Sequence, residues 1–184
     1  MVIRELIKSS GLSRLDAEVL LAHAMQIDRS KLLFMYQETV APSVAAVFSA
    51  LSEEAKKGCP IAYLLGEKEF YSLPFYVTPD TLIPRPDTEL LAEWCISHAE
   101  NKSVLDLCCG SGCIGITAAV YGKCAHLSLA DISLLALKVA EKNAARHGVS
   151  AEIRRLDILK DEIPGTYDII ASNPRILKMM LSAL

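Results

Sequence analysis

The stretch from Val104 to Gly115 reads Val-Leu-Asp-Leu-Cys-Cys-Gly-Ser-Gly-Cys-Ile-Gly, and its residue types suit a nucleotide-like ligand. Gly110 and Gly112 carry no Cβ, so the backbone can approach a ligand closely, and the amides that open the next helix can face it. The three glycines also fit a dinucleotide fingerprint. Asp106 distinguishes a dinucleotide from a cationic ligand, because a carboxylate here would repel a pyrophosphate and attract a cation. S-adenosylmethionine carries an ammonium and a sulfonium and no phosphate, so we expect it rather than NAD.

Three further polar sites follow predicted strands. Asp131 lies 19 residues beyond Gly112, where a carboxylate can accept both ribose hydroxyls of an adenosine. Asp157 can meet the adenine amino group, and Asn173-Pro174 belongs to no dinucleotide fingerprint. Each acid alone could be a helix cap. Because the carboxyl ends of parallel strands meet at one edge of a sheet, where ligands bind in such folds, these residues together predict a site.

The elements that position these residues alternate from residue 87 onwards. Apolar helical patterns and β-prone runs predict a parallel α/β sheet of the doubly wound type. The predicted helices cover 87–98, 113–121 and 133–146, and the predicted strands end at Asp106, Asp131, Asp157 and Asn173-Pro174.

The chain before residue 87 has a different pattern. Residues 1–58 predict a helical N-terminal domain of three short helices, one of them opened by the capping-box-like Ser13-Arg-Leu-Asp16. Residues 59–86 predict a linker with a β-hairpin, whose strands run from Glu67 to Phe70 and from Phe75 to Val77. The density of Pro, Tyr and charged pairs in this linker indicates that it also lines a site. Residues 87–184 are then the cofactor-binding domain.

Composition excludes several classes of protein. The net charge of −3 and the absence of a long Lys or Arg cluster argue against direct binding of nucleic acid. No signal-peptide pattern or membrane-length apolar run occurs, so we expect a cytoplasmic protein without a membrane partner. The six cysteines include no Cys-x-x-Cys pair, and the four histidines lie on separate elements. We therefore expect reduced thiols and no metal.

Taken in order, the motifs resemble the HemK/PrmC family, the glutamine-N5 methyltransferases of peptide chain release factors. The resemblance is carried by Pro-Ile-Ala-Tyr-Leu-Leu-Gly ending at Gly66, a Phe-Tyr hairpin, Leu-Ile-Pro-Arg-Pro-Asp-Thr-Glu ending at Glu89, the Val104 stretch, Ala-Asp-Ile-Ser from Ala130, and Ser-Asn-Pro ending at Pro174. It covers nearly all of the chain before the last ten residues. It implies a Rossmann-like class I methyltransferase sheet after a small all-α domain.

The resemblance also implies a cofactor, a partner and residue roles. The cofactor is S-adenosylmethionine, the protein substrate is a release factor, and the N-terminal helices help to hold that substrate. An amide nitrogen is a poor nucleophile, so a catalytic site must orient it and accept its hydrogens, which Asn173 Oδ1 and the Pro174 carbonyl can do. The residues implied to bind the cofactor are Arg85, Thr88, Asp106, Cys108, Gly110, Gly112, Asp131, Ile132, Asp157 and Asn173.

The last motif departs from the family pattern. The family reads Asn-Pro-Pro-Tyr, whereas this chain reads Asn173-Pro174-Arg175-Ile176. The missing Pro and Tyr remove part of the wall that clasps the glutamine side chain, so we expect impaired catalysis. One hypothesis is that a one-base deletion shifted the reading frame and that residues 175–184 are not family sequence. Resequencing the source DNA tests this hypothesis against a natural variant or a deliberate truncation.

A truncated sheet has a predicted physical consequence. The resemblance implies seven strands, and the sequence contains about four. The strand with Ile169 and Ile170 is then an exposed apolar edge, which predicts marginal stability or pairing into a dimer.

Three other functions are open from sequence alone. A DNA adenine amino-methyltransferase uses the same Asn-Pro-Pro-Tyr motif, but the acidic net charge of this chain disfavours that function. A second alternative is a fragment that binds the cofactor without turnover. An NAD enzyme would need a hydride-transfer residue, and we identify none.

Overall fold

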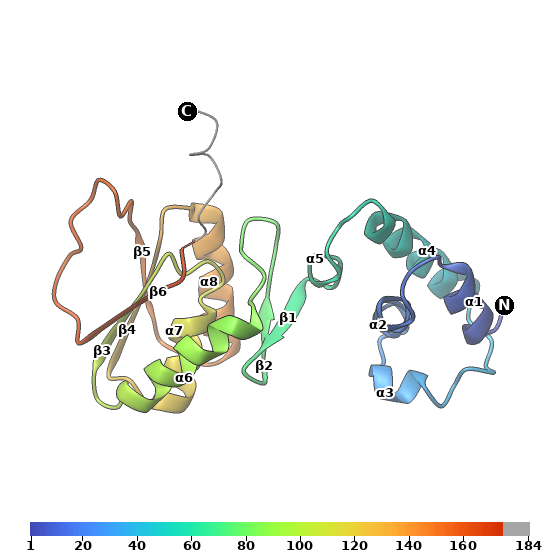
Figure 1. The fold of residues 1–184 in the computed structure, drawn as a ribbon, viewed down its shortest axis with the longest axis horizontal. Helices are drawn as coiled ribbons and strands as arrows, with labels where there is room; N and C mark the ends of the chain where they lie inside the picture. Colours follow the sequence, from blue (N-terminus) through green and yellow to red (C-terminus); the bar gives the residue numbers. More distant parts are fainter. Residues whose placement is uncertain (175–184) are drawn as a thin grey trace. The chain divides into compact units, whose positions relative to one another are not determined.

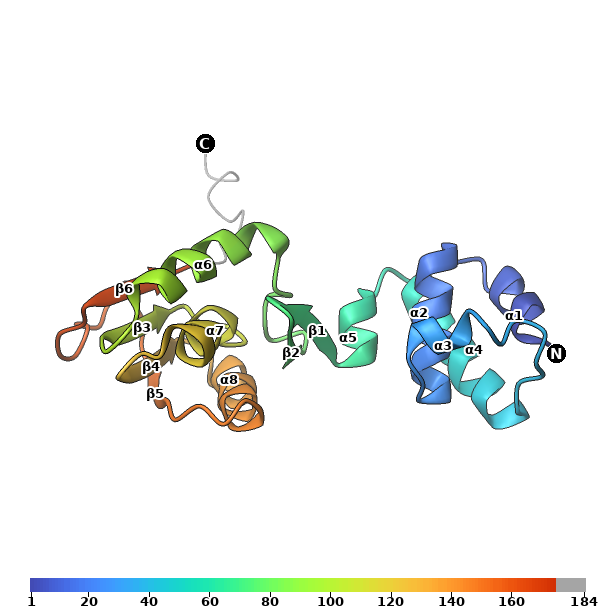
Figure 2. The same cartoon turned by 90° about the horizontal axis from the view of Figure 1, so that it is seen from below.

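The computed structural model describes residues 1–174 of the 184-residue chain. Figures 1 and 2 show its elements, which group into two compact units, Met1–Gly66 and the part from Glu67 onwards. The predicted departure at Arg175 and Ile176 lies outside the described residues. Within residues 1–174, no helix has both the length and the apolar character needed to cross a membrane.

The first unit is helical. Its helices are α1 Ile3–Ser9, α2 Arg14–Met25, α3 Arg29–Leu32, α4 Pro42–Lys56 and α5 Ile61–Leu65. Ser13 caps α2 as predicted, because its Oγ accepts a hydrogen bond from the Asp16 amide at 3.1 Å. The prediction of three helices before residue 58 was wrong, since α1 is a fourth. Its N-cap residue is Val2, which lacks the polar side chain that usually marks a helix start.

One apolar core holds the helices of the first unit together. Leu20, Leu21 and Phe48 are buried in it, and Leu64 of α5 packs against it. Because α5 contributes to this core, the unit extends to Gly66, whereas the sequence placed a linker from residue 59.

The second unit begins with an antiparallel hairpin of β1 Glu67–Phe70 and β2 Leu73–Tyr76. Tyr71 and Ser72 form its two-residue turn with φ of 50° and 61°, the positive values that a type I′ turn needs. The predicted turn of four residues was too long, because Pro74 lies within β2. A proline is compatible with a strand that has a free edge.

The sheet of the second unit is parallel, with strand order β5-β4-β3-β6. Its strands are β3 Ser103–Leu107, β4 His126–Asp131, β5 Glu152–Arg155 and β6 Ile169–Ser172. The central strand β3 pairs with β4 through Val104 and Leu127 and with β6 through Val104 and Ile169. The chain changes direction across the sheet at β3, and the carboxyl end beside such a switch point is where parallel sheets bind ligands.

Three helices cover one face of this sheet (Figures 1 and 2). They are α6 Glu89–His98, which follows the 3₁₀ turn Pro86–Thr88, α7 Cys113–Gly122 and α8 Leu134–Arg146. The sequence predicted a parallel α/β sheet of the doubly wound type, and the described residues place these three helices on one of its faces. The crossovers through α7 and α8 step across the sheet in the same direction, and right-handed crossovers of that kind place their helices together.

Strand β6 is an edge of the sheet among the described residues. Ile170 is 52% exposed there, as predicted for an apolar edge, but Ile169 is 6% exposed. The two side chains differ because successive residues of a strand point to opposite faces of the sheet.

Candidate functional site

The loop after β3 is the centre of the candidate site. It reverses the chain through three residues with positive φ, namely Cys108 at 61°, Gly110 at 55° and Gly112 at 77°. The Cys109 amide donates to the Ala130 carbonyl at 2.9 Å, which ties the loop to the end of β4. Glycine adopts these angles without the steric cost that a Cβ imposes.

Glycines at the start of α7 are required by close packing as well as by the turn. A Cβ on Gly112 would lie 2.9 Å from Ile116 Cδ1, and one on Gly115 would lie 2.8 Å from the Asp106 Cβ. Gly112 is therefore a packing residue beneath the loop, whereas Gly110 lines the pocket above it.

Asp106 lies beneath the pocket and does not form its wall. Its Oδ2 accepts a hydrogen bond from the Gly115 amide at 2.8 Å, while its buried Oδ1 has no partner among residues 1–174. Burial raises the pKa of Asp106 to about 7, against the lowering effect of that hydrogen bond, and the Asp131 carboxylate raises it further. The structure thus places Asp106 where it holds the start of α7, and its contact with the cofactor stays a prediction.

Asp131 joins the loop after β3 to the start of α8. Its Oδ2 accepts a hydrogen bond from the Gly110 amide at 2.9 Å, and its Oδ1 accepts one from the Ser133 amide at 2.9 Å. A carboxylate has about four lone-pair sites. Two are left to receive donors such as ribose hydroxyls.

A pocket of about 350 Å³ opens over this loop at the carboxyl ends of the strands. Seven of the predicted residues line it: Cys108, Gly110, Asp131, Ile132, Asp157, Asn173 and Pro174. Thr88 and Arg85 line a smaller recess that shares Cys108, Gly110 and Asn173 with the pocket. The structure therefore brings together all the predicted site residues except Asp106 and Gly112.

The electrostatic character of the pocket comes from its acids. Asp80, Asp131 and Asp157 line it, and no Lys or Arg is among its described lining residues. A hydrogen bond from the Leu159 amide is the main cause that holds the pKa of Asp157 below its usual value, although partial burial opposes it. Such a lining disfavours a pyrophosphate and favours a cationic ligand.

Several pocket residues were missed from the sequence. Asp80 and Leu82 come from the segment after the hairpin, whose prolines had indicated a site-lining role without naming a side chain. Leu156, Ile158 and Leu159 come from the segment after β5. No spacing signal marks them, because they only follow a strand end.

Asn173 is oriented by its neighbour across the site. Its Nδ2 donates a hydrogen bond to Thr88 Oγ1 at 2.9 Å, and its Oδ1 accepts no hydrogen bond from residues 1–174. The preceding residue, Ser172, donates from Oγ to the Leu107 carbonyl at 2.7 Å. The end of β6 is therefore fixed to both the 3₁₀ turn and β3.

Asn143 of α8 connects the loop to the hairpin. Its Oδ1 accepts from the Tyr76 amide at 2.7 Å, and its Nδ2 donates to the Tyr76 and Ser111 carbonyls at 3.0 and 2.9 Å. The side chain is completely buried. One amide thus fixes the end of β2, which leads to Asp80 and Leu82, against the loop that carries Gly110.

Comparison with protein families identifies the second unit. Residues 86–181 match the family model "Methyltransferase small domain". The chain belongs to this methyltransferase family. Residues 3–66 match the model "PrmC N-terminal domain", which agrees with the helical first unit.

Curated relatives carry both parts. The chain is 37% identical over 175 residues to a release factor glutamine methyltransferase of Chlorobaculum tepidum, with 88% of this chain and 60% of the relative covered. It is 38% identical over 178 residues to the protein of the same name from Bordetella pertussis, with 94% and 66% covered. The predicted resemblance is confirmed. The chain spans between about three fifths and two thirds of the length of these relatives.

A solved structure supports the fold. The structure described as "M. jannaschii TYW2 in complex with AdoMet" has a TM-score of 0.50 with this chain, at 15% sequence identity, over 56% of this chain and 48% of its own. At this identity the likeness concerns the fold alone, and it confirms the predicted α/β methyltransferase sheet.

Proposed function

We propose that the chain binds S-adenosylmethionine in the pocket over Gly110 and serves the N5-methylation of a glutamine side chain in peptide chain release factors. The observation that carries the proposal is the pocket itself, which combines three carboxylates, the loop after β3 and Asn173 at the carboxyl ends of the strands. The names of the curated relatives support the substrate.

The acids divide the recognition of the cofactor. In the proposal, the free lone pairs of Asp131 accept the ribose hydroxyls, and Asp157 faces the adenine amino group. Ile132 supplies an apolar wall beside the adenine, and Thr88, Arg85 and Cys108 surround the remaining recess. The cofactor, when bound, supplies a methyl group on a sulfonium, whose positive charge suits this acidic pocket.

Asn173 and Pro174 orient the substrate amide. Because Thr88 engages Nδ2, Asn173 presents Oδ1 as an acceptor for a hydrogen of the glutamine amide. The Pro174 carbonyl accepts the second hydrogen. Two acceptors align the nitrogen lone pair with the methyl group, and this contributes positioning and electrostatic stabilisation.

In this proposal the first unit contributes to substrate recognition, and the protein acts in the cytoplasm, where release factors work.

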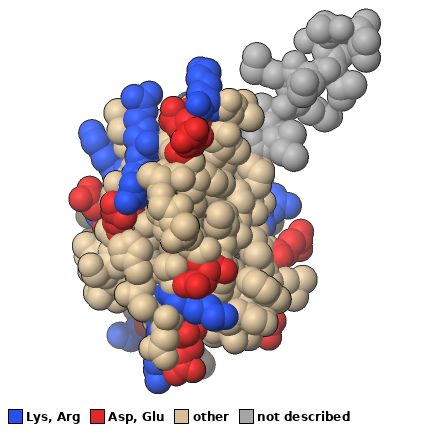
Figure 3. Space-filling view, turned by 90° about the vertical axis from the view of Figure 1, so that its left-hand side faces the viewer, with Lys and Arg blue, Asp and Glu red and all other residues tan. Residues whose placement is uncertain are grey.

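Recognition of DNA adenine has less support. The face drawn in Figure 3 shows blue and red side chains interspersed and no continuous basic band. Nucleic-acid binding depends on such a band.

Isothermal titration of the full chain with S-adenosylmethionine, with NAD as the control ligand, tests the cofactor. We expect saturable binding of S-adenosylmethionine alone, weakened about tenfold or more in Asp131→Asn and unchanged in Glu141→Gln on the exposed side of α8. Binding of NAD in its place would contradict the proposal. Transfer of a labelled methyl group to a purified release factor then tests the reaction.

A further inference from the structure

A second pocket, of about 460 Å³, lies in the first unit. Its lining residues are Arg4, Ile7, Lys8, Leu12, Arg14 and Tyr36. Three of these six side chains are cationic and none is acidic, while the half-buried Leu12 and the small exposed part of Ile7, 9% of that residue, provide apolar surface. This combination suits a ligand that carries both acidic and apolar groups.

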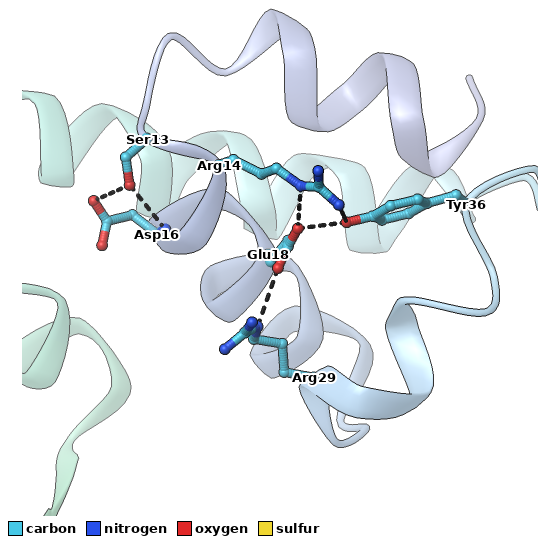
Figure 4. Close-up of polar contacts among 6 residues, drawn as sticks. All are labelled: Ser13, Arg14, Asp16, Glu18, Arg29 and Tyr36. Carbon is cyan, nitrogen blue, oxygen red and sulfur yellow. Dashed lines mark hydrogen bonds and ion pairs between the residues drawn. The ribbon is translucent and has the colours of Figure 1, made fainter.

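Arg14 is held in a fixed position at this pocket (Figure 4). Its Nε donates to Glu18 Oε1 at 2.7 Å, and its Nη2 donates to the Tyr36 hydroxyl at 3.2 Å. The guanidinium carbon lies 5.6 Å from the centre of the Tyr36 ring. These contacts use one edge of the guanidinium, and its Nη1 has no partner among the described residues.

Glu18 supports this arrangement from within the unit. It is 3% exposed and also accepts from Arg29 Nε at 3.0 Å and from the Tyr36 hydroxyl. Burial favours its neutral form, but the hydrogen bonds from Tyr36, Arg14 and Arg29 outweigh burial and keep its pKa below the usual value. The carboxylate is therefore satisfied inside the unit, and Arg14 can meet a further anion from outside.

Arg4 and Lys8 add two more cations. They are exposed residues four positions apart on α1, so they share one side of the helix. Among residues 1–174, no hydrogen bond or ion pair involves the side chain of Arg4 or Lys8. Unpaired cations beside an apolar surface are features of a recognition site for acidic groups.

The rest of the unit favours a protein segment over nucleic acid. Residues 1–66 contain seven Lys or Arg and seven Asp or Glu, so the unit has no overall basic character. Binding of a phosphate backbone depends on many cations spread over a face, whereas here three surround one pocket. The apolar surface from Ile7 and Leu12 also has no use against phosphates.

We propose, building on the proposed function, that this pocket holds an acidic segment of the release factor. Carboxylates of that segment meet Arg4, Lys8 and Arg14 Nη1, and an apolar side chain beside them contacts Ile7 and Leu12. The pocket then contributes to the affinity for the protein substrate, separately from the cofactor site.

Binding of the full chain to a purified release factor at two salt concentrations tests the proposal. We expect Lys8→Glu to weaken binding about tenfold or more at low salt and Lys8→Gln to weaken it less, because like charges repel and salt screens exposed charges. Lys57→Glu is the control, since it makes the same charge change at the residue after α4, where the side chain is 68% exposed and pairs with Glu54. Circular dichroism confirms that each variant is folded, and each should bind S-adenosylmethionine as the parent does.

Two competitors identify the chemistry of the segment. A hexapeptide of alternating Glu and Leu should displace the release factor, and a six-residue RNA should not. Displacement by the RNA alone would overturn the assignment to an acidic protein segment. Equal binding by the parent, Lys8→Gln and Lys8→Glu would overturn the pocket proposal and leave the proposed function intact, whereas no binding by the parent would contradict both.

Discussion

Each of the two units buries a carboxylate, but the pKa of the carboxylate is lowered in the first unit and raised in the second. Glu18 in the first unit receives hydrogen bonds from two arginines and a tyrosine, and its pKa lies below the usual value. Asp106 in the second unit receives one backbone hydrogen bond, and burial raises its pKa to about 7. The comparison shows that burial alone does not decide the charge of a carboxylate, because the donors around it do. Glu18 thus stabilises its unit, and Asp106 accepts the hydrogen bond of the Gly115 amide near the start of α7.

The largest effect is expected from Glu18→Ala. This variant removes the buried acceptor of three hydrogen bonds, from Arg14, Arg29 and the Tyr36 hydroxyl, so the first unit should lose about 3–5 kcal/mol of stability. Amide hydrogen exchange of residues 1–66 measures this loss. The fluorescence of Trp94, the single tryptophan, reports unfolding of the second unit, and the melting temperature it gives should be unchanged. A loss no larger than that of the surface pair variant Glu53→Ala would remove the distinction between a buried and an exposed carboxylate.

The second prediction concerns the pH dependence of the Asp106 site. Because the native pKa lies above the usual 3.8, the folded protein holds a proton that the unfolded chain releases between about pH 4 and pH 7. Stability from this residue therefore falls as pH rises through that window. Asp106→Asn cannot release the proton, so its stability relative to the parent should increase by on the order of 2–4 kcal/mol between pH 4.5 and pH 8. Urea unfolding followed by Trp94 fluorescence measures both profiles, and parallel profiles would show that Asp106 is ionised throughout.

The third prediction concerns Asn143→Asp, which replaces a buried amide of the second unit by a carboxylate. The substituted carboxylate can accept from the Tyr76 amide but cannot donate to the Tyr76 and Ser111 carbonyls. We expect a loss of about 1–3 kcal/mol of stability and a weaker affinity for S-adenosylmethionine, measured well below the melting temperature. Unchanged affinity in the folded variant would show that Asn143 stabilises the unit without positioning the loop. Glu141→Gln on the same helix is the control.

The smallest effect is expected from Thr88→Val, which removes the acceptor of Asn173 Nδ2 at nearly constant volume. Methyl transfer should slow about tenfold, because the amide of Asn173 is no longer held in one orientation. The affinity for S-adenosylmethionine should fall by a smaller factor than the rate does, because Thr88 is one of several residues that line the recess beside the pocket. Equal losses of affinity and rate would show that Thr88 acts through the cofactor and not through Asn173.

Sequence patterns predicted most of the second unit. The polar residues Asp131, Asp157 and Asn173, which lie at or just after strand ends, follow from alternating helix and strand signals, and the parallel topology brings them to one edge of the sheet. The role of Asp106 was not predictable in the same way, because only the packing of α7 against β3 shows that its side chain lies below the loop. The Glu18 contacts were also missed, since Arg29 and Tyr36 lie 11 and 18 residues away with no periodic relation to Glu18.

The order of strands also determines how the sheet is completed during synthesis. Strand β3 is synthesised well before β6. Asp168, the residue before β6, contacts Ser103 at the start of β3, and the two residues are 65 positions apart in the chain. At common synthesis rates, that interval lasts roughly 3–13 s. During this time one edge of β3 has no neighbour, while the first unit, built from nearer contacts, can already fold. A nascent chain of this kind is therefore most prone to aggregate before β6 arrives, and slower translation of residues 108–168 would lengthen that period.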